Sequence, residues 1–126
     1  AVSQLRALNR EEDIDLVYFG GLRTGTDSAK MIALGASAVV IGAAAAFALG
    51  ADVSDGKPVY HADLEQAERE ERCYNLLQAF NAESAMMARC TGKTNVHNLE
   101  PEDLRAITLA VARAAGVPMS GSLNRH

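Results

Sequence analysis

Two glycine-rich turns are the places in this sequence where side-chain and backbone chemistry is expected. Gly20-Gly21-Leu22-Arg23-Thr24-Gly25 follows one apolar run, and Gly42-Ala43-Ala44 follows a second. Glycine lets the backbone approach a ligand closely and turn successive N–H groups toward it, and a guanidinium adds a formal positive charge. These residue types predict a site for a phosphate group, built from the following residues: Gly20, Gly21, Arg23, Gly42 and Ala43.

The elements that must position these turns form a strand, a helix and a strand. Residues 14–19 and 38–41 are apolar, and residues 26–35 between them have helical spacing. Thr24 or Thr26 is expected to cap this helix, with Asp27 in its first turn. Such a βαβ unit requires a parallel pair of strands, and continuously apolar strands are expected to be buried on both faces. Both turns then follow strand ends within one unit.

Other chemistries fit the sequence less well. GGLRTG lacks the spacing of the dinucleotide-binding fingerprint, and the chain has no Gly-Lys-Ser/Thr phosphate loop. His61 and His97 have no partner at ligand spacing, so no metal site is predicted. The acidic residues around Pro101 are expected to stabilise a helix start rather than to act as acids or bases. The main alternative to a phosphate site is a pair of tight turns without a ligand.

Composition excludes several classes of protein. The chain has 126 residues and a formal net charge of −4, which argues against a nucleic-acid partner. Residues 31–51 carry no charge, but their glycines and β-branched block predict a helix end, a strand and a turn rather than a membrane span. Cys73 and Cys90 share one predicted helix about 25 Å apart, too far for a disulfide. Both thiols are expected to be reduced and buried, as in a cytosolic protein.

The chain divides into three expected parts. Residues 1–50 hold a helix tail and the βαβ unit, residues 51–62 are polar and predict a loop, and residues 63–126 predict C-terminal helices over about 63–89 and 101–115. Two parallel strands make a poor sheet alone, so we expect a larger fold or a partner chain. Phosphate sites in (β/α)8 barrels commonly follow strands 7 and 8. The expected fold class is therefore α/β: the C-terminal portion of a (β/α)8 TIM barrel, with strands 7 and 8, plus C-terminal helices.

A family resemblance adds to this prediction. VYFGGLRTGTDSAKMIALGASAVVIGAA resembles the strand 7–helix 7–strand 8 segment of FMN-dependent (β/α)8 barrels. With the later CTGKTNVHNLEPEDLRAITLAVARAAGVPMSG, the region from about Asp15 to Gly121 is similar to the glutamate synthase family. The resemblance implies that residues 1–126 are part of an FMN-binding synthase domain. It also implies that FMN is the cofactor and that its phosphate is held at Gly20, Gly21, Arg23, Gly42 and Ala43, where Ala43 replaces a more usual Thr.

The resemblance also implies a function. It is that of a cytoplasmic FMN-dependent oxidoreductase that converts 2-oxoglutarate to glutamate by reductive amination. The 2-oxo acid site and the catalytic residues, which are unknown, would lie in the rest of the barrel or a partner subunit, so the chain is not expected to be active alone. No membrane partner is expected.

The iron–sulfur cluster of bacterial glutamate synthases is not expected here. The resemblance places its three cysteines at Ala51, Lys57 and Ala62, and such a cluster requires thiolates. This departure leaves three alternatives open: an N-methylglutamate synthase large subunit-like protein, a relative of the 2-hydroxy-acid oxidases, and a non-catalytic α/β subunit that has lost its flavin.

Overall fold

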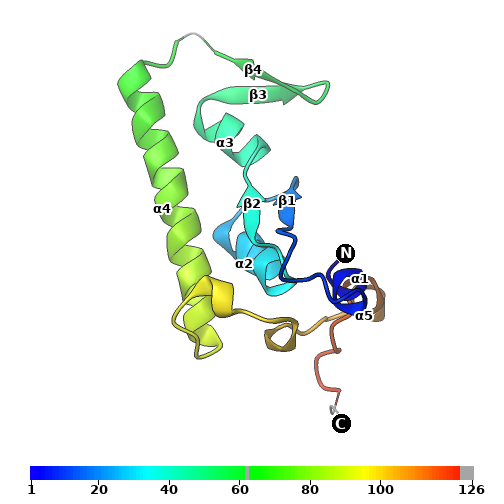
Figure 1. Cartoon of the computed structure of the whole chain (residues 1–126). Coiled ribbons are helices and arrows are strands. Elements are labelled where there is room, and N and C mark those ends of the chain that lie inside the picture. The colour runs from blue at the N-terminus through cyan, green and yellow to red at the C-terminus, as the bar shows by residue number, and fades with distance from the viewer. Residues whose placement is uncertain (62, 123–126) are drawn as a thin grey trace.

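The chain folds into a mixed α/β structure, known here from a computed structural model that describes residues 1–61 and 63–122 (Figure 1). The long helix α4 runs beside α2 and α3, with a hairpin near one of its ends. The elements are, in order, α1 (Val2–Ala7), β1 (Val17–Phe19), α2 (Gly25–Ala33), β2 (Ala38–Val40), α3 (Ala43–Ala48), β3 (Ala51–Ser54), β4 (Lys57–Tyr60), α4 (Gln66–Cys90), the 3-10 turns η1 (Val96–Asn98) and η2 (Pro101–Asp103), and α5 (Leu109–Ala115).

The predicted βαβ unit is confirmed. β1 and β2 pair in parallel, with Phe19 opposite Val40, although β1 is shorter than residues 14–19. Thr24 caps α2, since its hydroxyl accepts a hydrogen bond from the Asp27 N–H at 3.3 Å. Parallel pairing brings the carboxyl ends of both strands to one edge of the sheet. The Gly20-Gly21 turn and Gly42 both begin at that edge.

The expected burial of these two strands is wrong for the described residues. Relative exposure is 59% for Val17, 73% for Phe19 and 42% for Val40. In the part of the chain that the structure describes, each strand has one hydrogen-bonded neighbour, so each keeps one open edge. The apolar composition of the strands indicates a need for cover that residues 1–61 and 63–122 do not supply.

A β-hairpin stands where residues 51–62 predicted a loop. β3 and β4 pair antiparallel, with Val53 opposite Pro58. Asp55 and Gly56 form the turn with φ of 52° and 73°, and a type I′ turn requires positive φ at both of these positions. The polar residues and Pro58 had favoured a loop, but an edge strand tolerates proline because its N–H need not join a ladder. Helix α3 is a second difference, since a turn was expected after β2.

Arg69 holds this hairpin segment to α4. Its guanidinium donates to three backbone carbonyls that lie before β3 and after β4. The compact ammonium group of a lysine would not reach all three together. The acceptors are Leu49 O at 2.8 Å, Leu64 O at 3.2 Å and His61 O.

The C-terminal region is less helical than predicted. The long helix is confirmed as α4, but the expected helix over 101–115 is split into η2 and α5. The split arises because Ala106 forms a bridge with Met119: its N–H donates to Pro118 O at 2.9 Å, and its carbonyl accepts from Ser120 at 2.8 Å. Thr108 then caps a new helix, which ends at Gly116 as predicted.

Alanines of α2 and α4 form the buried core together with Leu99, which follows η1. Ala29, Ala33, Ala88 and Leu99 make one buried cluster. Cys73 is half-buried and Cys90 is exposed, both as free thiols, so the expectation of burial is wrong for Cys90, which lies in the last turn of α4. Among the described residues, no helix is both long enough and apolar enough to cross a bilayer.

Candidate functional site

The two glycine-rich turns lie at one edge of the β1–β2 sheet. Gly20 and Gly21 follow β1 with φ of 115° and 69°, a backbone region that strongly favours glycine. Gly42 follows β2 and precedes α3 as its N-cap. A Cβ added to Gly42 would stand 3.7 Å from the ring of Phe19, at the end of β1. The structure therefore brings Gly20, Gly21, Gly42 and Ala43 to the same edge.

The backbone of these turns has free hydrogen-bonding capacity. Within residues 1–61 and 63–122, the N–H groups of Gly20, Gly21, Ala43 and Ala44 donate to no turn, loop or side-chain acceptor. A Cβ at Gly20 or Gly21 would meet no atom within 4 Å, so the space beside the first turn is open. Unpaired amides beside open space suit a phosphate group, which has several acceptor oxygens.

Arg23 contributes differently from the glycines. Its backbone N–H donates to Asp27 Oδ2 at 3.2 Å, so this amide is already paired within the chain. Its guanidinium lies 3.6 Å from the same carboxylate, and the side chain is 84% exposed. Arg23 thus offers an exposed positive charge near the turn rather than a backbone donor.

The start of α2 is occupied by acidic and hydroxyl side chains of the protein itself. The Thr26 N–H donates to Glu83 Oε2 at 3.2 Å, and Ser84 Oγ donates to Gly25 O at 2.8 Å. A carboxylate at this position satisfies the helix dipole as an external anion would. Glu83 and Ser84 were not predicted as site residues, because they lie on α4 and no local sequence pattern links Glu83 to Thr26, 57 positions away.

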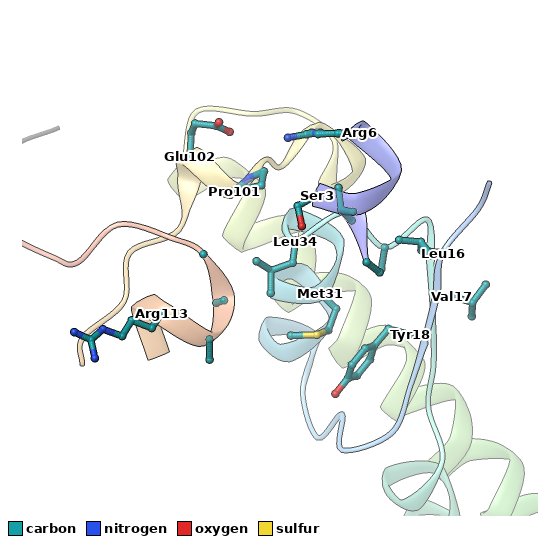
Figure 2. Close-up of a pocket in the computed structure, with 17 residues that line it drawn as sticks. Ser3, Arg6, Leu16, Val17, Tyr18, Met31, Leu34, Pro101, Glu102 and Arg113 are labelled. Atoms are coloured by element: carbon teal, nitrogen blue, oxygen red, sulfur yellow. The ribbon is translucent and has the colours of Figure 1, made fainter. Parts of the chain in front are cut away.

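A groove of about 770 Å³ lies at the opposite end of α2 (Figure 2). It is bordered by α1, β1, η2 and α5, with Tyr18, Met31 and Leu34 among its apolar lining. Arg6 and Arg113 also line it. None of the five predicted site residues does, so the groove is separate from the glycine-rich turns.

The remaining polar candidates have structural contacts. His61 Nε2 lies 2.7 Å from Asp52 Oδ2, and His97 Nε2 lies 3.2 Å from Ser37 O. The described residues hold no group of three or more His, Cys, Asp or Glu side chains placed to bind a metal ion. Of the positions compared with the iron–sulfur cysteines, Ala51 and Lys57 lie on β3 and β4, and Ala62 lies outside the described residues.

The acidic residues around Pro101 stabilise the start of the short 3-10 turn η2 rather than of the longer helix that was predicted. Glu100 and Asp103 form a reciprocal capping box at η2. The Lys93 ammonium lies 2.7 Å from Asp103 and 3.0 Å from Glu100. Its hydrogen bond to Asp103, and then that to Glu100, raises the pKa of Lys93. The hydrogen bond from Lys93 in turn lowers the pKa of Asp103.

Comparison with known proteins identifies the family. Residues 1–66 match the family model of the FMN-dependent dehydrogenases. The chain is 34% identical, over 97% of its length, to a glutamate synthase large subunit-like protein of Rhizobium meliloti. It is 33% identical, over 88% of its length, to the pre-mycofactocin synthase of Mycolicibacterium smegmatis. The chain spans 34% and 24% of the length of these two relatives. No solved structure matches it.

These matches define the class of protein to which the chain belongs. The chain belongs to the FMN-dependent dehydrogenase family, and FMN is its cofactor. The turns at Gly20-Gly21 and Gly42-Ala43 fit the phosphate of FMN because their amides are unpaired and the space beside the first turn is open.

Proposed function

We propose that the two glycine-rich turns bind the phosphate of FMN. The backbone N–H groups at Gly20, Gly21, Gly42 and Ala43 hold its oxygens, and the Arg23 guanidinium adds positive charge. The observation that carries this proposal is the presence of unpaired amides from both strand ends at one edge of the sheet, in a member of an FMN-dependent family. At Ala43 the phosphate gains an amide donor and no hydroxyl.

In the larger fold, β1 and β2 serve as strands 7 and 8 of a (β/α)8 barrel. Each strand has an open edge and exposed apolar side chains, which further strands and helices of a barrel would cover. The whole of residues 1–126 then belongs to one FMN-binding domain, in which α4 and the C-terminal elements pack outside the last βαβ unit. The rest of the barrel is supplied by the same polypeptide or by a partner subunit.

The reaction we propose is of the glutamate synthase type: reductive amination of 2-oxoglutarate to glutamate in the cytoplasm. The name of the Rhizobium meliloti relative supports this choice, and the free thiols of Cys73 and Cys90 suit a reducing compartment. FMN supplies the electron transfer, and this chain anchors it by its phosphate, so the chain alone is not active. The 2-oxo acid binds elsewhere in the barrel.

A second candidate is an FMN-dependent oxidoreductase with another substrate. The pre-mycofactocin synthase relative is 33% identical and has a different name, which supports a candidate with another substrate. Turnover assays with 2-oxoglutarate and ammonia, using the intact natural protein, separate the two candidates.

The phosphate site is tested by placing a carboxylate in the first turn. Gly21→Asp should weaken FMN binding by the intact natural protein about 100-fold or more, because a carboxylate in this turn would repel the phosphate. Gly56→Asp is a matched control: both glycines have similar φ, 69° and 73°, and open space around them. FMN fluorescence quenching measures both affinities. Equal affinities for Gly21→Asp and Gly56→Asp would refute the site.

A further inference from the structure

We infer that Glu83 and Ser84 of α4 are positioning residues, which hold the first glycine-rich turn in the conformation that binds FMN. This inference rests on the phosphate site proposed above. The family match ends at residue 66, where α4 begins, so these two residues lie outside the part of the chain that the family model covers.

The contacts between α4 and the start of α2 are direct and involve the backbone. Glu83 accepts from the Thr26 N–H at 3.2 Å, and Ser84 Oγ donates to Gly25 O at 2.8 Å. Gly25 is so close to α4 that an added Cβ would lie 2.2 Å from the carbonyl oxygen of Phe80. Both backbone groups of this junction are therefore fixed by α4, and only glycine allows the approach.

These contacts reach the turn through the next residues along the chain. Gly25 is the last residue of the turn and Thr26 follows it, and Thr24 caps α2 by accepting from the Asp27 N–H. The carboxylate of Asp27 then accepts from the Arg23 N–H at 3.2 Å. Fixing the first turn of α2 thus fixes the exit of the glycine-rich turn and the place of the Arg23 backbone.

Glu83 also directs where the phosphate binds. Its half-buried carboxylate already satisfies the Thr26 amide and neutralises the positive end of α2. The phosphate is therefore left to the amides of the two strand ends, which are unpaired in the described residues.

The experiment compares three variants of the intact natural protein by FMN fluorescence quenching and urea unfolding. Glu83→Ala should weaken FMN binding about tenfold, because losing a hydrogen bond to a charged group lets the turn leave its binding conformation, and the affinity falls with the population of that conformation. Glu83→Gln keeps an acceptor oxygen and should stay within about threefold of the natural protein. Met87→Ala removes packing between the same two helices, so it should lower the urea midpoint while FMN affinity stays within about threefold.

Several results would overturn the inference: unchanged FMN affinity in Glu83→Ala, no rescue by Glu83→Gln, or an equal loss in Met87→Ala. If Glu83→Ala does not fold, Ser84→Ala decides, with a loss of about threefold expected from removing a neutral hydrogen bond and no loss counting against the inference. The Gly21→Asp variant separates the two proposals. If it abolishes FMN binding while Glu83→Ala does not weaken it, only the positioning role is wrong; if it has no effect, the phosphate site itself is wrong.

Discussion

Gly25→Ala should destabilise the protein strongly, because this glycine is the point of closest approach between α2 and α4. The added methyl would lie 2.2 Å from the Phe80 carbonyl oxygen and 2.7 Å from Glu83 Cβ, far inside van der Waals contact. Both contacts belong to α4, whose backbone near Phe80 is held in the middle of a 25-residue helix. We therefore expect α2 to shift rather than α4 to deform.

The size of the effect follows from two contributions. Overpacking of this kind costs about 1–3 kcal/mol. A shift of α2 also stretches the bonds from Ser84 Oγ to Gly25 O and from the Thr26 N–H to Glu83, each worth about 1 kcal/mol. Alanine recovers up to about 1 kcal/mol through its higher helix propensity. The net loss in the free energy of unfolding should be about 2–4 kcal/mol.

Urea unfolding of the intact natural protein measures this loss, and Ser28→Ala provides the matched comparison. Ser28 lies one turn further along α2, is 4% exposed, and its Oγ has no hydrogen-bond partner among the described residues. Removing this unpaired hydroxyl should stabilise the protein by about 1 kcal/mol. The two substitutions to alanine in one helix should therefore have opposite signs. A loss below about 1 kcal/mol for Gly25→Ala would refute the close packing of α2 on α4.

Two further predictions concern charged side chains outside the glycine-rich turns. Arg69→Met removes the donor to three carbonyls around the hairpin, so we expect the free energy of unfolding to fall by about 2 kcal/mol and amide exchange in β3 and β4 to become faster. Arg72→Met breaks an exposed ion pair with Glu68 and should change the free energy of unfolding by less than about 0.5 kcal/mol. Because Lys93 lowers the pKa of Asp103, the Asp103 carboxylate stabilises the fold above pH about 4, and this contribution is lost as the pH falls further. Asp103→Asn should therefore make the urea midpoint less dependent on pH on the acid side. The raised pKa of Lys93 acts in the opposite sense, because its contribution is lost only as the pH rises above about 10.

Local signals made the βαβ unit and α4 predictable from the sequence. The Thr24 cap, the glycine after each strand and the helical spacing of α4 act over a few residues, and the structure retains each of them. The hairpin was missed although Asp55-Gly56 is a strong turn signal, because Pro58 and the polar neighbours argued against a strand.

Features that depend on distant contacts were not predictable in this way. The expected helix over 101–115 is interrupted by the bridge between Ala106 and Met119, in which a backbone partner outside the helix replaces the helical one. Glu83 is a similar case within the candidate site, since its effect on α2 depends on how α4 packs. Neither contact leaves a periodic pattern in the sequence.

The candidate site and the exposed strands have one structural cause. β1 and β2 each have a single hydrogen-bonded neighbour among the described residues, so their apolar side chains are left uncovered. The chain turns away at glycines within two residues of each strand end, and the amides at Gly20, Gly21 and Ala43 therefore lie beyond the last ladder positions. Because Glu83 already occupies the start of α2, these strand-end amides are the donors that remain for an anion at this edge. Uncovered strand edges and unpaired strand-end amides are thus two consequences of the same short parallel pair.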